Sequence, residues 1–360
     1  MRRMRDPFTM AVMALATTAL AAVLAMAQSA PTSLPATASQ PATTPVDPVK
    51  AAKQAALRDA LKAYPHQIVY QASVNRKREL RRMNADGSAR VKLSKETPDG
   101  ELYPHCSADG SKICFVSIQG QKDERRNNIY VMDADGGGER TLVAKNAFDP
   151  CWNRDGTAIA YMPGEFDRWT DADYASKGLA FYAVKTAQTR MHANKDLHHL
   201  YVPCWSPDGK WIVATVHGGM GYDHAILAIQ ADGEKVCQLK GINGCRPDIS
   251  PDDKKLAWNR TDQAIGLADL DLTGDTPIVS NVRSVVTCDK EHMVYHADWS
   301  PDGKYIAFDY GPSDKLPKGL SRRVDICVAD AAETDVWVPI TDDVSSSEPD
   351  WLRFDAKKDK

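Results

Sequence analysis

A tight-turn motif that recurs along the chain constrains the fold more than any other feature of the sequence. Its clearest copy is His296–Phe308, HADWSPDGKYIAF, in which Trp-Ser-Pro-Asp-Gly-Lys follows one strand and a largely apolar run begins the next. Pro301 presets φ at the first corner of the turn, and Gly303 accepts a backbone conformation that a side chain would resist. The motif therefore predicts a β-hairpin.

The hairpin recurs at similar intervals, which indicates a repeat protein. Four further copies, two close and two looser, are Pro203–Ala214, Pro150–Tyr161, Pro247–Trp258 and Pro104–Phe115. The turn aspartates of the five copies, Asp109, Asp155, Asp208, Asp252 and Asp302, are separated by 46, 53, 44 and 50 residues. A repeat of about 40 to 50 residues with four strands is typical of one propeller blade.

A sixth copy is divided between the two ends of the repeat region. Glu348–Trp351 matches the first half of the motif and stops before its turn, and Gln67–Gln71 matches the strand that should follow that turn. Pairing of these two strands would close a ring, whereas a solenoid would have atypical capping repeats at both ends. We therefore predict an all-β fold, a six-bladed β-propeller whose ring is closed by N- and C-terminal strands in one blade.

The same motifs carry a family resemblance. The Trp-Ser-Pro-Asp-Gly-Lys hairpin and the later stretch Ile129–Gly136, IYVMDADG, resemble the TolB-like, WD-repeat-like propellers over roughly residues 67–354. The resemblance implies the propeller fold. It leaves the function open, because propellers include both binding proteins and enzymes.

The region before the repeats differs in composition from the rest. Residues 1–27 combine an arginine-rich start, an apolar run and an Ala25-Met26-Ala27 cleavage site, as a secretory signal peptide does, with an uncleaved anchor as the alternative. Residues 28–48 are rich in Ala, Pro and Thr and predict a flexible linker. Residues 49–63 predict a short helix, and residues 64–356 the propeller. A periplasmic or secreted protein is expected.

Net charge narrows the range of partners. Loss of residues 1–27 would change the net charge from −3 to −5. Such a surface is repelled by nucleic acid, so no nucleic-acid partner is expected. No transmembrane span is expected in the mature chain either.

Eight cysteines in an exported chain raise the question of disulfides. Cys237 and Cys245 are the candidate pair, because they flank the connection between two blades. For Cys114, Cys151 and Cys204 we expect buried free thiols.

Candidate ligand residues gather on one predicted face of the ring. The turns of the repeated motif lie on one face, here called the turn face; the longer and more varied connections lie on the other, here called the variable face. Function on a repeat scaffold is usually carried by such varied loops. The candidates on this face are His217, Asp223, His224, His292 and His296. They could bind a ligand or a divalent cation or act in proton transfer, and the alternative is that they only make hydrogen bonds in turns.

A second set of candidates follows from the repeat frame. The position before each inner-strand tryptophan, or its equivalent, is occupied by His105, Cys151, Cys204, Asp248, Asp298 and Asp350. Near a central channel, these groups could gather a cation. Alternatively, each aspartate accepts backbone N–H groups and joins its blade to the next. No cofactor is expected, although a divalent cation is possible.

Two functions are compatible with these patterns. The sequence has no Gly-x-Ser-x-Gly motif, no Gly-rich phosphate-binding motif and no C-x-x-C-H haem site. The favoured hypothesis is a non-enzymatic scaffold that binds a protein or peptide partner in the cell envelope through the variable face and the channel mouth. The alternative is a metal-assisted polysaccharide lyase or hydrolase that uses the histidines of the same face, as in the oligogalacturonate lyases, which have propellers that resemble this one.

Overall fold

The computed structural model describes residues 47–75, 77–94, 100–120, 126–164, 178–313 and 323–354. The predicted signal peptide and residues 28–46 of the predicted linker lie outside the described residues. Within the described part, no helix combines the length and the apolar character needed to cross a membrane.

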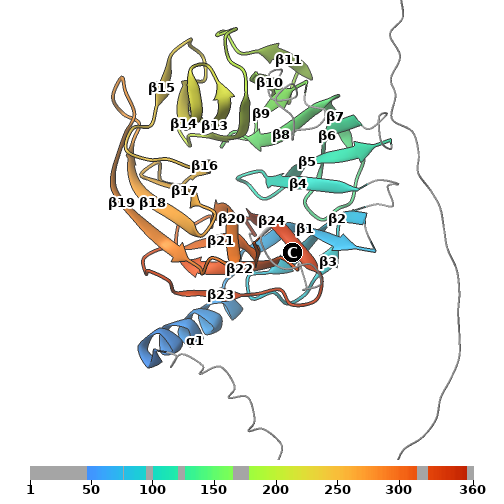
Figure 1. Cartoon of the computed structure of the whole chain (residues 1–360). Helices are drawn as coiled ribbons and strands as arrows, with labels where there is room; N and C mark the ends of the chain where they lie inside the picture. The colour runs from blue at the N-terminus through green and yellow to red at the C-terminus, as the bar shows by residue number, and fades with distance from the viewer. Residues whose placement is uncertain are drawn as a thin grey trace, which may run out of the picture. The chain divides into compact units, whose positions relative to one another are not determined.

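The described residues form one helix, α1 (Pro48–Lys62), and six four-stranded antiparallel sheets arranged as the blades of a ring (Figure 1). Blade 1 contains β1 (Gln67–Val74), β2 (Lys77–Asn84), β3 (Val91–Lys92) and β24 (Ser345–Leu352). Blade 2 contains β4 (Glu101–Cys106), β5 (Lys112–Gln119), β6 (Arg126–Asp133) and β7 (Thr141–Ala144). Blade 3 contains β8 (Ala147–Trp152), β9 (Ala158–Pro163), β10 (Ala180–Ala183) and β11 (Gln188–Met191).

The second half of the ring follows the same order. Blade 4 contains β12 (Leu200–Trp205), β13 (Trp211–Gly219), β14 (Tyr222–Gln230) and β15 (Val236–Gln238). Blade 5 contains β16 (Cys245–Ile249), β17 (Lys255–Thr261), β18 (Ala264–Asp271) and β19 (Ile278–Thr287). Blade 6 contains β20 (His292–Trp299), β21 (Tyr305–Pro312), β22 (Asp325–Asp330) and β23 (Trp337–Pro339).

The six-bladed propeller predicted from the repeat is confirmed, including the shared blade. β1 pairs antiparallel with β24, so Ile68 lies opposite Trp351 and Gln67 opposite Leu352. The first strand of the propeller and the last are therefore neighbours in one sheet (Figure 1).

The recurrent turn has a common hydrogen-bond pattern, seen clearly in blade 6. The Gly303 N–H donates to the Ser300 carbonyl over 2.8 Å, and Asp302 Oδ1 accepts the Lys304 N–H over 3.2 Å. Ser300 Oγ accepts the Tyr305 N–H over 2.9 Å. Gly303 has φ +72°, which a residue without a Cβ adopts without strain. The motif therefore specifies its turn through local hydrogen bonds.

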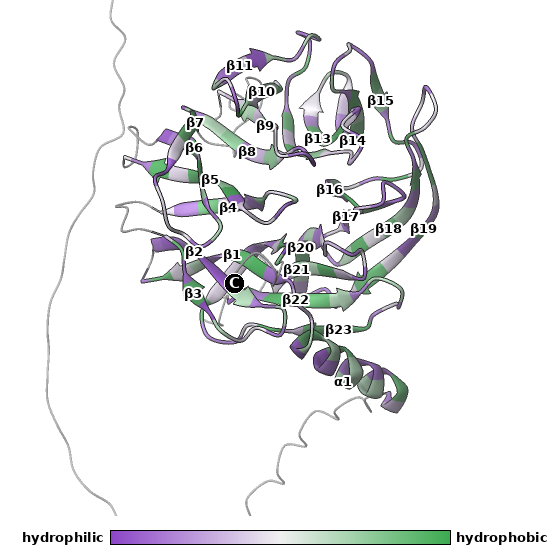
Figure 2. Ribbon diagram, turned by 180° about the vertical axis from the view of Figure 1, so that it is seen from behind, coloured by the Kyte–Doolittle hydropathy of each residue, from purple (hydrophilic) through white to green (hydrophobic). Residues whose placement is uncertain are grey.

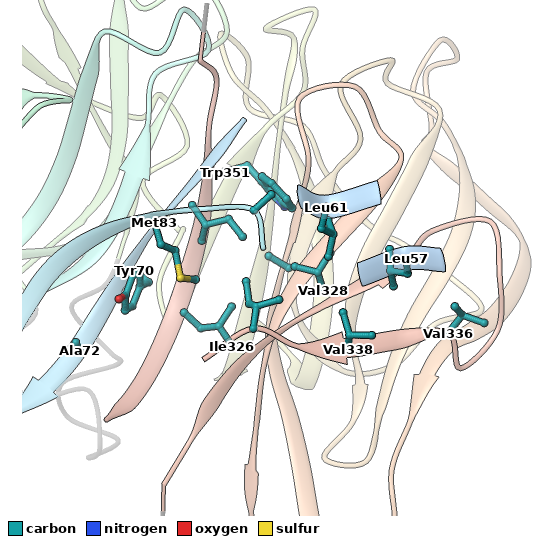
Figure 3. Close-up of a cluster of buried hydrophobic side chains, with 14 residues drawn as sticks. Leu57, Leu61, Tyr70, Ala72, Met83, Ile326, Val328, Val336, Val338 and Trp351 are labelled. Atoms are coloured by element: carbon teal, nitrogen blue, oxygen red, sulfur yellow. The ribbon is translucent and has the colours of Figure 1, made fainter. Parts of the chain in front are cut away.

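Helix α1 packs across the junction between blade 6 and blade 1. It begins at an Asp47 cap whose side chain accepts the Val49 N–H, and it carries hydrophilic and hydrophobic residues along its length (Figure 2). Leu57 and Leu61 are buried against Val336 and Val338 of blade 6, in a cluster that also includes Trp351 of blade 1 (Figure 3). The helix thus covers the seam where the ring is closed.

Candidate functional site

The innermost strands of the six blades line a central channel. A cavity of about 100 Å³ lies on the side where these strands begin, which is the side of the variable face. A second cavity of about 150 Å³ lies on the side of the turn face. Both are lined by His105, Cys204, Asp248, Asp298 and Asp350, so the predicted channel residues lie between the two cavities.

Six equivalent residues surround the first cavity at the mouth of the channel. This set, here called the mouth ring, consists of Tyr103, Asp149, Val202, Arg246, His296 and Glu348. All six have a left-handed backbone, with φ between 47° and 54°. Pairing of each inner strand with its neighbour shifts register at this point. A β-bulge therefore recurs in every blade, and it redirects one side chain per inner strand toward the mouth.

Hydrogen bonds from neighbouring blades hold the bulges in place. The Val202 N–H donates to Asp149 Oδ2 over 2.9 Å, and the Tyr103 N–H donates to Glu348 Oε2 over 3.1 Å. In three further blades the acceptor comes from the second strand of the preceding blade. These pairs are Arg246 N–H with Thr215 Oγ1 (2.8 Å), His296 N–H with Asn259 Oδ1 (3.2 Å) and Glu348 N–H with Asp309 Oδ1 (2.8 Å). A left-handed conformation costs a non-glycine residue about 1–3 kcal/mol, and these bonds help to hold it.

The deeper set, here called the channel ring, consists of His105, Cys151, Cys204, Asp248, Asp298 and Asp350. In the described part of the chain, five of its members, all except Cys151, accept a backbone N–H group from the next blade. Asp248 accepts from Trp299 over 2.8 Å, and Asp298 accepts from Trp351 over 2.7 Å. Asp350 accepts from Cys106 over 2.8 Å. The structure thus shows the inter-blade bonding that the sequence analysis offered as the alternative to a cation site.

Burial changes the acid–base properties of the channel ring. It raises the pKa of Asp248 to about 6. It also raises the pKa of Asp298, which the nearby Asp350 and Asp248 carboxylates raise further, and the pKa of Asp350. For His105, burial acts to lower the pKa, but Cys151, Asp350 and Asp298 together raise it above its ordinary value. The ring therefore concentrates acidic groups that resist ionisation.

At the mouth, His296 and Arg246 are each held by defined neighbours. His296 Nδ1 lies 2.7 Å from Oδ2 of the buried Asp309, and burial raises the pKa of Asp309. The Arg246 guanidinium lies 5.8 Å from the ring centre of Tyr201 and 5.1 Å from that of Tyr295, on the two adjacent blades. These cation–π contacts help to orient the guanidinium group.

The candidates His217, Asp223 and His224 lie in the extension of a hairpin and not in a long irregular connection. β13 continues to Gly219, β14 starts at Tyr222, and His217 is the register partner of His224. The two-residue turn, Met220-Gly221, has φ of 54° and 81°, which suits a tight hairpin between twisted strands.

The histidines of this hairpin are connected to the mouth ring by Tyr201, which precedes the mouth-ring residue Val202 in the sequence. His224 Nε2 is 2.8 Å from the Tyr201 hydroxyl, and the His217 and His224 rings are 5.5 Å apart. Partial burial, His217 and Arg246 lower the pKa of His224. Asp223 is exposed, and its side chain makes no hydrogen bond or ion pair with another described residue.

His292 does not line the channel. Its Nδ1 lies 2.8 Å from Asp289 Oδ1, and its ring stacks on Tyr310 at 4.8 Å. It starts β20, four residues before His296. Of the five residues predicted on the variable face, only His296 lines the cavity, together with the predicted channel residues His105, Asp248, Asp298 and Asp350.

Sequence reasoning missed the remaining mouth residues, Tyr103, Asp149, Val202, Arg246 and Glu348. A signal for them exists in the repeat frame. Each stands two residues before a channel-ring residue, and in all of these blades a proline separates the two. These mouth-ring residues are hard to recognise in the sequence because they share a backbone conformation and not a residue type.

The cysteines are free thiols, so the predicted bridge between Cys237 and Cys245 is wrong. Cys237 lies in β15, the outermost strand of blade 4, and Cys245 starts β16, the innermost strand of blade 5. Three strand spacings of about 4.8 Å separate the two edges of a blade, which exceeds the Cα separation of about 7 Å that a disulfide tolerates. Among the described residues, no group of three or more His, Cys, Asp or Glu is arranged to hold a metal ion.

Parts of the chain are similar in sequence to known proteins. No family model matches the chain. It is 30% identical over 214 residues, or 57% of its length, to the uncharacterized peptidase YuxL of Bacillus subtilis. It is 35% identical over 63 residues, or 17% of its length, to the Tol-Pal system protein TolB of Methylococcus capsulatus. These matches span only 28% and 15% of the two relatives.

Among solved structures, TolB from Acinetobacter baumannii is similar, with a TM-score of 0.58 at 19% sequence identity. The similarity covers 86% of this chain and 74% of that one. The predicted resemblance to the TolB-like propellers is therefore confirmed at the level of the fold.

Proposed function

We propose that this chain, which shares its propeller fold with TolB, is an exported scaffold that binds a protein or peptide partner in the cell envelope. The partner would dock on the variable face and place one segment in the mouth of the channel. The signal-like residues 1–27 support export, and the shared fold supports a binding role.

The mouth ring is the observation that carries this proposal. Six identical backbone bulges present an aromatic, an aliphatic, a basic, an imidazole and two acidic side chains around one cavity. Strained backbone of this kind clusters at sites that recognise ligands, because the surrounding structure must hold it in place. A uniform backbone with varied side chains is suited to reading an irregular partner surface.

The chemistry of the mouth fits recognition of a peptide. The Arg246 guanidinium is oriented by two tyrosines, and arginine and tyrosine are residues that often dominate binding energy at protein interfaces. His296, held by Asp309, adds a polar ring nitrogen at the same mouth. Tyr103 lies 4.7 Å from Phe148, ring centre to ring centre, and gives the mouth an aromatic wall.

Site-specific photo-crosslinking in the native cell envelope tests the proposal. A photoreactive phenylalanine analogue replaces Tyr103 at the mouth or, as a matched control, Thr273 in the turn between β18 and β19 on the opposite face. We expect one discrete adduct from position 103, identified by mass spectrometry, and none of the same mass shift from position 273. The adduct should weaken when Arg246→Ala is added, provided that the variant melts at the parent temperature. Equal adducts from both positions, or none from position 103, would contradict the proposal.

A further inference from the structure

The wall of the variable-side cavity changes character with depth. Between the mouth ring and the channel ring lies an apolar collar, formed by one residue from each inner strand: Pro104, Pro150, Pro203, Pro247, Ala297 and Pro349. Below it lie the carboxylates of Asp248, Asp298 and Asp350. An entering group therefore meets an apolar sleeve first and carboxyl groups, with the His105 imidazole beside them, afterwards.

Two of the carboxylates keep an oxygen available for a ligand. Asp298 accepts the Trp351 N–H on Oδ2, and Asp350 accepts the Cys106 N–H on Oδ1. No N–H or O–H group in the part of the chain that the structure describes donates to their other oxygens, although the Cys106 thiol also interacts with the Asp350 carboxylate. Asp350 is only 7% exposed, and both residues line the cavities on either side. Asp248 differs, because its second oxygen receives the Cys204 thiol at 3.2 Å.

The depth of the cavity matches a long side chain. Mouth-ring and channel-ring residues are two positions apart on the same strand, which corresponds to about 7 Å. The four-carbon stem of lysine spans a similar distance, and such stems pack on apolar surface while their charged ends find polar partners. A compact ammonium also offers three donors to the two available carboxylate oxygens.

The two cavities differ in charge, which sets a direction of entry. The turn-side cavity is lined by Arg154 and Arg353, whose guanidinium groups donate to the carbonyls of Pro251 and Pro301. A cation approaching from that side would be repelled. On the variable side, the carboxylates of Asp149 and Glu348 line the same mouth as Arg246 and His296.

Building on the proposed function, we propose that the partner inserts a lysine side chain into the channel from the variable face, with its ammonium between Asp298 and Asp350. Its stem lies in the apolar collar. The site favours lysine because a side chain without the apolar stem would leave the collar unfilled, and a side chain without the positive charge would not pair with the carboxylates.

Proton linkage follows from the groups around the ammonium, which are His105, Cys151, Cys204, Asp248, Asp298 and Asp350, with Arg246 and His296 above them. The aspartate pKa values are raised in the unliganded channel by burial and, for Asp298, also by mutual repulsion. A bound cation favours their ionised forms, so binding releases protons. Affinity should therefore increase as the pH rises from about 5 to about 8.

Titration of the purified protein with capped tripeptides tests the inference. The probes are Ac-Gly-Lys-Gly-NH2 and Ac-Gly-norleucine-Gly-NH2, which have similar stems and differ in charge. We expect the lysine peptide to bind at least about tenfold more tightly by calorimetry or NMR. Asp298→Asn and Asp350→Asn should each weaken binding of the lysine peptide about tenfold, while the matched Asp275→Asn variant, in the exposed turn between β18 and β19 on the opposite face, leaves it unchanged.

The results of this titration and of the crosslinking experiment separate a failure of the inference from a failure of the proposed function. The asparagine variants keep an oxygen for the Trp351 and Cys106 N–H groups, so folding can be checked by their melting temperatures. Equal binding of the two peptides, no binding of the lysine peptide at millimolar concentration, or no effect of either variant overturns the inference. A mouth-specific crosslink found together with such a result would leave the proposed function standing. Selective binding of the lysine peptide without any crosslink would overturn the proposed function alone.

Discussion

Single aspartates in the channel ring combine two tasks that oppose each other. As hydrogen-bond acceptors, Asp248, Asp298 and Asp350 join consecutive blades through the N–H groups of Trp299, Trp351 and Cys106. As buried carboxylates close to one another, they are costly to ionise. The same residues therefore hold the ring together and limit its stability at neutral pH.

This conflict predicts how stability depends on pH. The folded-state pKa of Asp248 is about 6, above its ordinary value of 3.8, so the folded protein binds the proton more tightly than the unfolded chain does. The stabilisation of the folded protein by this tighter proton binding is complete below about pH 3.8 and is lost as the pH rises through about 6. Urea unfolding should show the free energy of unfolding decreasing across this window, by up to about 3 kcal/mol from Asp248.

Asp248→Asn is the control for that measurement, because it keeps an acceptor and cannot ionise. It should flatten the decrease between about pH 4 and 6. The turn aspartates Asp208, Asp252 and Asp302 have lowered pKa values and so act in the opposite direction, below that window. A wild-type protein whose stability rises between pH 4 and 6 would contradict the argument.

Residues of the site were predictable from the sequence only where residue type and repeat position agree. The channel ring could be found because its aspartates recur before tryptophans. Arg246 and Glu348 were harder to find, because their side chains have nothing in common and only the proline that follows each of them marks their shared left-handed backbone position in the sequence. His296 was found as a histidine, but its partner Asp309 lies on the next strand, and that pairing depends on the register of β20 and β21.

At the scale of elements, the repeat predicted strands better than it predicted their lengths. The hairpin β13–β14 extends past His217 because Gly219 allows a close approach to His199: a Cβ there would lie 2.6 Å from atoms of the His199 side chain. This hairpin contains three glycines, Gly218, Gly219 and Gly221, and the structure uses Gly219 for packing and Gly221 for the turn. That distinction depends on a contact between segments and cannot be seen in the local sequence.

Helix α1 should contribute to the stability of the ring through its buried face. Leu61 is 1% exposed and packs in the seam cluster with Trp351 and Val338 (Figure 3). We expect Leu61→Ala to lower the free energy of unfolding by about 2–5 kcal/mol, whereas Val49→Ala on the exposed side of the same helix changes it by less than about 0.5 kcal/mol. Denaturant unfolding monitored by tryptophan fluorescence measures both. Equal midpoints for the two variants would show that the helix does not stabilise the seam.

At the scale of the whole molecule, the ring depends on its last strand. Deletion of residues 347–360 removes most of β24 and leaves the inner edge of β1 unpaired. Loss of the buried Trp351 alone should cost about 3–5 kcal/mol. A thermal melt followed by circular dichroism should show a much lower or a non-cooperative transition. A control that lacks only residues 355–360 should melt at the parent temperature, and a truncated protein that also does so would disprove closure through the shared blade.

The pairing of β1 with β24 also imposes an order in time. Ile68 cannot pair with Trp351 until the ribosome has made the intervening chain. At about 5–20 residues per second, this takes on the order of 15 to 60 s. During that interval β1 has an open edge, which is prone to pairing with other chains. The complete ring can therefore form only after the whole repeat region has been synthesised, and the edge of β1 needs protection until then.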